Sequence, residues 1–267
     1  MLVLYVDDGL LTSTDPELLN CFLLELRTEF KIETRSPNYI LGLKIVHTSN
    51  GQLIISQKAL VKKILERFNF SECRPVSTPI LKTECTGKGK EVVPEEEKTE
   101  EEEKKKDGEN KNLQFPYREA VGALMYLILG TRPDLAYTVS FISRSLENPS
   151  SEDVANGKRA FRYIARTTTL GIVYATDLKT GILECYFDAD YGGCSKTGRS
   201  TTGVLIKHAG GAISWLSQRQ PIVTTSTTES EIDAATEATK EIIWLKRLLK
   251  DVSKLNETPT DVGAVRG

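Results

Sequence analysis

Residues 182–187 read Ile-Leu-Glu-Cys-Tyr-Phe, and two more short apolar segments follow at 203–207 and 212–215, with glycine-rich turns between them. Short apolar runs bounded by glycine predict β-strands. A helical pattern comes next, over residues 228–249. Three strands followed by a helix are typical of the front half of a compact α/β unit. The helix is expected to turn the following residues inward: Ile232, Ala235, Ala238, Ile242, Leu245 and Leu249.

A strongly charged segment, residues 84–112, interrupts the chain. It carries eleven acidic and seven basic residues, and its large apolar side chains are Val92 and Val93. Such a segment cannot bury enough apolar surface to offset the entropy of ordering it, so we expect an acidic disordered linker. Its net charge of −4 leaves only +2 for the rest of the chain, which argues against a strongly basic nucleic-acid binder.

The N-terminal segment, residues 1–83, begins with an apolar hairpin pattern. Residues 2–6 and Leu10-Leu11 predict two buried strands, joined by a tight turn at Asp7-Asp8-Gly9. The stretch Thr14-Asp15-Pro16-Glu17 has the spacing of a capping box and predicts the start of a helix.

A second strand–strand–helix pattern follows in the same segment. Residues 39–47 and 53–55 flank Ser49-Asn50-Gly51, which is typical of a hairpin, and Ser56 is expected to cap the next helix. The order ββα, ββα predicts an α+β fold rather than a Rossmann alternation. The inward residues of the second helix are expected to be Leu60, Val61, Ile64, Leu65 and Phe68.

Residues 113–180 carry apolar residues at helical spacing. Ser151-Glu152-Asp153 is expected to open the last of three helices, and residues 253–267, which lack periodicity, are expected to be loose. The expected inward residues are Val121, Leu124, Met125, Ile128 and Leu129 in the first helix, Leu135, Val139, Ile142 and Leu146 in the second, and Val154, Phe161 and Ile164 in the third.

Two pairs of aspartates are candidate ligands for a divalent cation. Asp7 and Asp8 lie side by side at a hairpin tip, which suits a cation shared with phosphates, although Asp-Gly is also a common turn. Asp188 and Asp190 end an apolar strand on one of its faces, which suits either a metal or the end of the strand.

Glu229 and Glu231 begin the long helix, where two roles are open. Thr228-Glu229-Ser230-Glu231 is itself a capping box with Glu231 at its third helical position, and acidic residues there complement the helix dipole. A metal-binding role is the alternative.

Aromatic and basic residues give weaker signals. Phe187, Tyr191, Trp215 and Trp244 suit base stacking or a core. Basic residues on two helices suit phosphate contacts or a solvated face; they are Lys62, Lys63, Arg67, Lys240, Lys246 and Arg247.

Composition narrows the class of protein. Five cysteines without a C-x-x-C pair and only two histidines argue against a disulfide framework or a structural zinc site. The chain lacks the roughly 18–20-residue apolar run of a membrane span and the basic start of a secretory signal. We therefore expect an intracellular protein, cytoplasmic or nuclear, that is not secreted and not in a membrane.

The order of several motifs matches a known family. Tyr5-Val6-Asp7-Asp8 resembles the YxDD box of reverse transcriptases, and Asp188-Ala189-Asp190-Tyr191-Gly192-Gly193 resembles the start of the ribonuclease H domain of copia-type retrotransposons. The resemblance covers almost the whole chain apart from the linker and the tail. The other similar segments are 39–45, 55–57, 67–68, 73–79, 117–118, 124–127, 131–135, 158–159, 162–163, 200–203, 213–215, 218–220 and 229–231.

The resemblance implies a domain order and two metal sites. Residues 1–83 would be a palm and thumb remnant of a reverse transcriptase, 113–180 a helical connection, and 181–267 an incomplete ribonuclease H-like domain of mixed α/β fold. Asp7 and Asp8 would bind Mg²⁺ at the polymerase site, and Asp188 and Glu231 at the ribonuclease site. Glu231 fits better than Glu229 because Glu-Ile-x-Ala matches the family pattern. The implied partners are a template-primer or an RNA–DNA hybrid, and remaining Pol segments or another protein stay open as partners.

Each implied site lacks a carboxylate. The family's third polymerase Asp lies well before the YxDD box, whereas this chain begins four residues before Tyr5. The family's next ribonuclease strand carries an Asp-Asn pair, whereas Asp261 comes too early to match it. Since two-metal hydrolysis takes several fixed carboxylates, two hypotheses stand: a Mg²⁺-dependent reverse transcriptase and ribonuclease H, or a truncated relic that binds nucleic acid or protein without catalysis.

Overall fold

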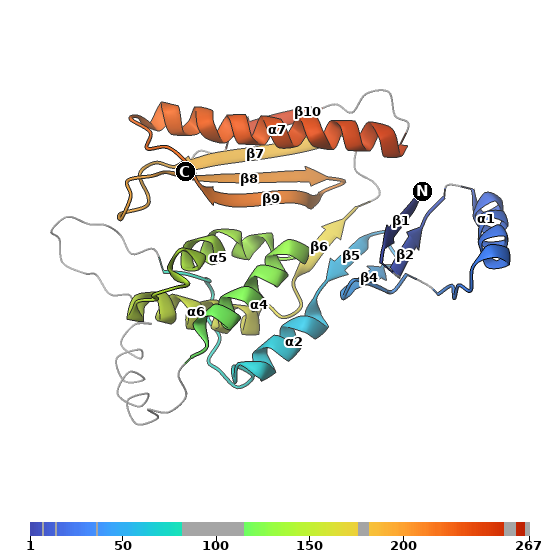
Figure 1. Cartoon of the computed structure of the whole chain (residues 1–267), viewed down its shortest axis with the longest axis horizontal. Coiled ribbons are helices and arrows are strands. Elements are labelled where there is room, and N and C mark those ends of the chain that lie inside the picture. Colours follow the sequence, from blue (N-terminus) through green and yellow to red (C-terminus); the bar gives the residue numbers. More distant parts are fainter. Residues whose placement is uncertain are drawn as a thin grey trace.

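The computed structural model describes residues 1–6, 8–13, 15–35, 37–81, 115–175, 182–253 and 260–264, with Ser253 and the last five described by their backbone alone. Across these residues the chain forms three separate β-sheets and a set of helices that follow the strands in blocks (Figure 1). This arrangement is α+β, as the sequence predicted. The predicted linker, residues 84–112, lies outside the described residues.

The C-terminal sheet has the strand order β10-β7-β8-β9. Strands β7 (Leu183–Asp190), β8 (Thr201–His208) and β9 (Gly211–Arg219) are antiparallel neighbours, and β10 (Thr260–Ala264) lies parallel to β7. Residues 260–264 therefore form a strand, and the expectation of a loose tail was wrong for them. The tail lacks periodicity but gains the backbone hydrogen bonds of β7.

Helix α7 (Thr227–Ser253) covers one face of this sheet (Figure 1). Its residues Ala238, Ile242 and Leu245 are buried against the strands, as predicted, and Leu249 packs beside them. Ile232 is 62% exposed, so its predicted inward position was wrong. The buried face of the helix instead begins with Ser230 and Ala234, which are completely buried.

A second core unites four helices: α2 (Lys58–Arg67), α4 (Tyr117–Gly130), α5 (Ala136–Ile142) and α6 (Ser151–Arg166). Two short 3₁₀ turns, η2 (Pro133–Leu135) and η3 (Ser143–Ser145), flank α5. The completely buried Phe161 ring lies at the centre, with three other phenylalanine rings 5.0–6.1 Å away. The predicted inward residues of α2, the second predicted helix and α6 all contribute to this core.

Helix α4 differs from its prediction by part of a turn. Met125 is 42% and Leu129 80% exposed, so both predicted inward positions were wrong. The buried stripe instead passes through Val121, Leu124 and Leu127, three residues apart, which places Met125 and Leu129 on the outer side.

The middle sheet has the order β3-β4-β5-β6, all antiparallel. Its strands are β3 (Tyr39–Ile40), β4 (Leu43–His47), β5 (Leu53–Ser56) and β6 (Gly171–Tyr174). The predicted hairpin lies between β4 and β5, where Gly51 has a φ of +80°. Since β6 comes from the segment after the linker, this sheet joins residues 39–56 to residues 171–174.

Ser56 does not cap α2, contrary to the prediction. It is the buried last residue of β5, and the residue before α2 is Gln57, whose side chain makes no capping hydrogen bond to α2. The Gln57 side chain instead accepts hydrogen bonds from the backbone N–H and the hydroxyl of Thr131, which ties α2 to the end of α4.

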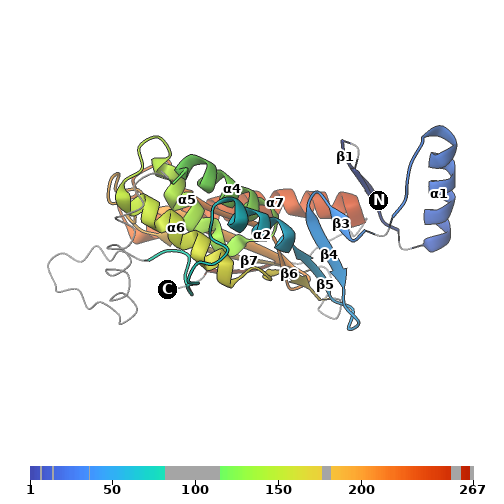
Figure 2. The ribbon, with the colours of Figure 1, turned by 90° about the horizontal axis from the view of Figure 1, so that it is seen from below.

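The N-terminal hairpin of β1 (Leu2–Tyr5) and β2 (Asp8–Leu11) forms as predicted, and α1 (Pro16–Glu29) follows it. Asp15 caps α1 by accepting from the Glu17 and Leu18 amides; Thr14, the other predicted cap residue, lies outside the described residues. The prediction that both strands are buried was wrong. All four residues of β1 are at least 40% exposed, because neither buried cluster includes the hairpin. Figures 1 and 2 show the hairpin and α1 at one end of the molecule.

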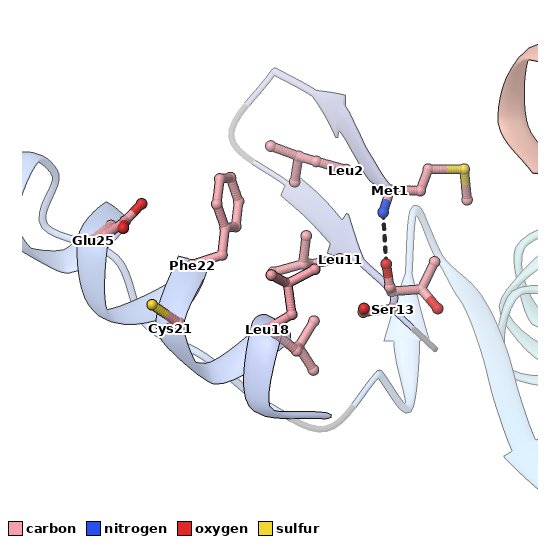
Figure 3. Close-up of a pocket in the computed structure, with 10 residues that line it drawn as sticks. Met1, Leu2, Leu11, Ser13, Leu18, Cys21, Phe22 and Glu25 are labelled. Carbon is pink, nitrogen blue, oxygen red and sulfur yellow. Dashed lines mark hydrogen bonds between the residues drawn. The ribbon is translucent and has the colours of Figure 1, made fainter. Parts of the chain in front are cut away.

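A cavity of about 310 Å³ lies between this hairpin and α1. Leu18 and Phe22 of α1 line it from one side, and Leu2 and Leu11 from the other (Figure 3). The amino group of Met1 donates a hydrogen bond to the Thr12 carbonyl at 2.6 Å, which closes the open end of the hairpin.

Candidate functional site

The C-terminal sheet places Asp188 and Asp190 at the carboxyl end of β7. Leu183, Cys185 and Phe187 of this strand pack toward α7, so the alternation of a strand turns both aspartates to the opposite face. Both residues are exposed. The chain turns closely after Asp190, since a Cβ on Gly193 would lie 1.8 Å from the Asp190 Oδ2 atom.

A buried polar chain ties this end of β7 to the first turn of α7. Thr202 of β8 lies opposite Ala189 in the register. The Gln220 Nε2 group donates to the Thr202 hydroxyl at 3.0 Å and to the Ser230 carbonyl at 2.9 Å, and all three residues are at most 2% exposed. Buried polar groups of this kind fix the elements that they join. The turn of α7 that carries Glu231 is thereby held at the same end of the sheet as the two aspartates.

Capping at α7 falls on Glu229 and Ser226, not on the predicted box with Glu231. The Ser226 hydroxyl accepts from the Glu229 amide at 3.1 Å, and the Glu229 carboxylate accepts from the amide and the hydroxyl of Thr225. These hydrogen bonds lower the pKa of the Glu229 carboxyl, and the bond from the Thr225 amide is the largest cause. Glu231 has no part in these capping bonds, so the capping explanation for it was wrong.

The described residues do not supply a full ligand set for two cations. No group of three His, Cys, Asp or Glu side chains that could hold a metal ion occurs in this part of the chain. By the alternation of β7, Asp188 lies on the sheet face opposite α7, whereas Glu231 belongs to α7. Asp261 pairs in register with Glu184, four residues before Asp188, so its strand position does not complete the site. Two-metal hydrolysis, which requires several fixed carboxylates, is not supported by these residues alone.

Of the two candidate polymerase aspartates, the structure describes Asp8. Asp8 is an exposed residue of β2 that lies opposite Tyr5, and Asp7 lies outside the described residues.

Residues from the preceding helical region pack against the sheet face opposite α7, and sequence reasoning missed them. The Arg144 Nη2 group donates to the Thr201 hydroxyl at 3.2 Å, and Thr201 lies opposite Asp190 in the register. Burial raises the pKa of the Tyr137 phenol, the Asp190 carboxylate raises it further, and Arg144 lowers it. Tyr137 and Arg144 therefore lie near Asp190. Tyr137 and Phe141 are four residues apart on one helix, a spacing that was visible in the sequence, but nothing there indicated which sheet this helix would face.

Cys194, in the loop after β7, is a second feature that sequence reasoning did not single out. Burial raises the pKa of its thiol, but hydrogen bonds from Thr197, Arg219 and the Lys196 amide outweigh burial and bring the pKa down to about 7. The Arg219 Nη1 group lies 3.8 Å from the sulfur. The low pKa of the Cys194 thiol therefore comes from the hydrogen-bond donors that surround the sulfur in this loop.

The aromatic and basic candidates divide between packing and surface roles. Phe187 packs in the core, and the Trp215 indole donates to the Ile128 carbonyl at 2.8 Å, whereas Tyr191 and Trp244 are exposed. Arg67 pairs with Glu119 on the surface. The other predicted basic residues are exposed, namely Lys62, Lys63, Lys240, Lys246 and Arg247.

Comparison with known proteins identifies the family. Residues 1–82 match the family model described as reverse transcriptase (RNA-dependent DNA polymerase). The chain is 40% identical over 254 residues to the retrovirus-related Pol polyprotein from transposon TNT 1-94 of Nicotiana tabacum, covering 94% of this chain and 18% of that protein. It is 31% identical over 252 residues to the Pol polyprotein from transposon RE1 of Arabidopsis thaliana, covering 94% and 16%.

A third relative has a similar length to this chain. An uncharacterized mitochondrial protein of Arabidopsis thaliana is 32% identical over 248 residues, covering 91% of this chain and 93% of that protein. This chain belongs to the copia-type retrotransposon Pol family, as the resemblance predicted. It spans less than a fifth of the two Pol polyproteins.

No solved structure matches this chain. Among the residues described above, no helix is both long and apolar enough to cross a membrane.

Proposed function

We propose that this chain is a segment of a copia-type Pol protein whose residues 181–267 form a ribonuclease H-like domain, which binds an RNA–DNA hybrid but does not cleave it unaided. Residues 1–83 would be the palm and thumb part of a reverse transcriptase, 84–112 a disordered linker and 113–180 the connection. The observation that carries the proposal is the buried Thr202–Gln220–Ser230 chain, which holds the end of β7 and the first turn of α7 together.

The sheet topology supports the ribonuclease part of this proposal. Three antiparallel strands lead into a long helix, and a further strand then pairs parallel to the first. Asp188 on the first strand and Glu231 on the helix are the two carboxylates that the family resemblance implies. Glu231 is free of the capping bonds that Glu229 makes, which favours Glu231 as the site residue of the pair.

The carboxylate count supports the absence of cleavage. Mg²⁺, the metal implied for both candidate sites, would find Asp188 and Asp190 on the face of the sheet opposite α7, whereas Glu231 belongs to α7 and Asp261 of β10 lies at the level of Glu184. A second cation would therefore have too few anionic ligands to be held in place beside the scissile phosphate.

The test is binding and cleavage of a labelled RNA–DNA hybrid by the full chain, with Mg²⁺ or Mn²⁺. We expect binding at low salt and no cleavage above that of Asp188→Asn and Glu231→Gln. Cleavage that either substitution abolishes would overturn the inactive assignment and indicate a working ribonuclease site. Absence of any hybrid binding by the folded protein would overturn the nucleic-acid role.

A protein-binding role is the second candidate, and the exposed N-terminal hairpin favours it. Leu4 and Tyr5 are 69% and 61% exposed, and the cavity beside the hairpin is lined by apolar side chains. The matching Pol polyproteins are more than five times as long as the aligned segment. The remaining Pol segments are the partner proposed for this surface. In the resulting assembly, Asp7 and Asp8 would lie at the polymerase site that the family resemblance implies, where a template-primer binds.

A further inference from the structure

A row of side chains crosses the face of the C-terminal sheet opposite α7, at the end that carries the aspartates. In the register, Asp190 of β7 lies opposite Thr201 of β8, which in turn lies opposite Arg219 of β9. Directly opposite residues share a sheet face. Arg144 reaches this row from η3 through its hydrogen bond to the Thr201 hydroxyl. Two guanidinium groups thus flank one threonine beside an exposed carboxylate.

Neither arginine has a carboxylate partner among the described residues. Arg144 bonds to a neutral hydroxyl and lies 5.6 Å from the centre of the Phe141 ring, and Arg219 bonds to the Cys194 sulfur. This differs from Arg132 in the helical core, which forms a salt bridge to Asp134 and is 1% exposed. A guanidinium has five N–H donors, so most donors of Arg144 and Arg219 are left for a ligand.

The ring beside Arg144 adds a second element of recognition. Tyr137 stacks on Phe141 with ring centres 6.3 Å apart, and Tyr137 is 37% exposed. Aromatic faces next to arginines suit nucleic acids, because bases stack on rings while guanidinium groups bind phosphates in a bidentate way.

We propose that Arg144 and Arg219 form a phosphate clamp that holds the backbone of an RNA–DNA hybrid across the Asp190–Thr201–Arg219 row. Arg144 belongs to the helical region before the sheet, so the clamp assigns that region a direct part in substrate binding. This inference rests on the proposed function, since it names the hybrid contacts of the same site.

The test measures hybrid binding by the full chain at several salt concentrations, with Arg144→Gln and Arg219→Gln. Arg166→Gln is the matched control, because Arg166 is an exposed arginine in the last turn of α6, at the other end of that helix from the candidate row. Each clamp variant is expected to reduce the slope of log affinity against log salt by about 0.9, which corresponds to about tenfold weaker binding near 0.1 M salt. The Arg166→Gln control is expected to leave the slope at its wild-type value.

Arg144→Lys and thermal unfolding separate binding from a structural role. Lysine restores the charge but not the planar fork, so we expect it to recover the salt slope. If Arg144→Gln lowers the unfolding temperature and leaves the slope unchanged, Arg144 is a structural tether and the clamp is wrong. Equal losses in the Arg166→Gln control would also refute it. A wild-type chain that binds no hybrid would instead refute the proposed function itself.

Discussion

The N-terminal hairpin unit, β1 to α1, and the helical core around Phe161 differ in how they use apolar residues. Both are rich in them, yet α1 has no buried residue, whereas Phe161, Leu124 and Leu127 are completely buried. The hairpin carries the Tyr5-Val6-Asp7-Asp8 box, and the helical core carries other segments that resemble the family, at 117–118, 124–127, 131–135, 158–159 and 162–163. The comparison teaches that a motif marks descent and that burial marks what this chain can stabilise by itself.

The largest expected difference between the two regions is the cost of removing a phenylalanine. Phe161→Ala should lower the free energy of unfolding by about 3–5 kcal/mol, because it leaves a cavity where three other rings meet. Phe22→Ala in α1, where the ring is 38% exposed, should cost less than about 1 kcal/mol. Urea unfolding of both variants measures this, and equal costs would break the comparison.

A buried ion network should give the next largest effect. Arg132 contacts Asp134 through three hydrogen bonds and donates to the Thr167 hydroxyl at 2.7 Å. Arg132→Ala should cost about 2–4 kcal/mol, since it leaves these acceptors without their charged donor. Arg67→Ala removes a surface pair whose side chains are 66% and 62% exposed and should cost less than about 1 kcal/mol. Thermal and urea unfolding compare the two, and a cheap Arg132 substitution would contradict the burial argument.

Capping at α7 is expected to have a smaller effect. Ser226→Ala removes the acceptor of the Glu229 amide and should lower stability by about 1 kcal/mol. Glu231→Gln should leave stability unchanged, because Glu231 makes none of the capping bonds described above. Chemical unfolding of both variants sharpens the assignment, and a destabilised Glu231→Gln would return Glu231 to a structural role.

At neutral pH the smallest effect is expected at Cys194, and this effect depends on pH. Its thiol pKa is lowered from 9.0 to about 7 in the fold. A lowered pKa adds stability that is complete above the unfolded value and is lost as the pH falls through the folded value. The difference in unfolding temperature between wild type and Cys194→Ala should therefore grow from pH 6 to pH 9, in favour of wild type. A constant difference would show that Arg219 and Thr197 do not stabilise a thiolate.

Much of the fold could be predicted from local patterns. Strands β7, β8 and β9, the hairpin at Ser49-Asn50-Gly51 and the inward face of α6 follow from periodicity and turn chemistry. Boundaries and faces were less predictable. The predicted inward face of α4 wrongly included Met125 and Leu129, because several apolar residues on that helix allow more than one inward face.

The candidate site was predictable as a set of residues but not as an arrangement. Asp188 and Glu231 were named from motifs, whereas Arg144 and Tyr137 gave no signal, since their relation to Asp190 depends on how a helix packs on a distant strand. The strand at 260–264 was missed because its main support is backbone pairing with β7.

The sequence by itself determined the family, the α+β class and the acidic residues at strand and helix ends, because these depend on residue order and short-range periodicity. Only the tertiary structure decided that the hairpin is unburied, that Glu229 rather than Glu231 takes the capping bonds, and that the helical region before the sheet brings Arg144 to Thr201, opposite Asp190. These outcomes depend on strand register and on packing between segments far apart in the chain, and neither is encoded in a local pattern.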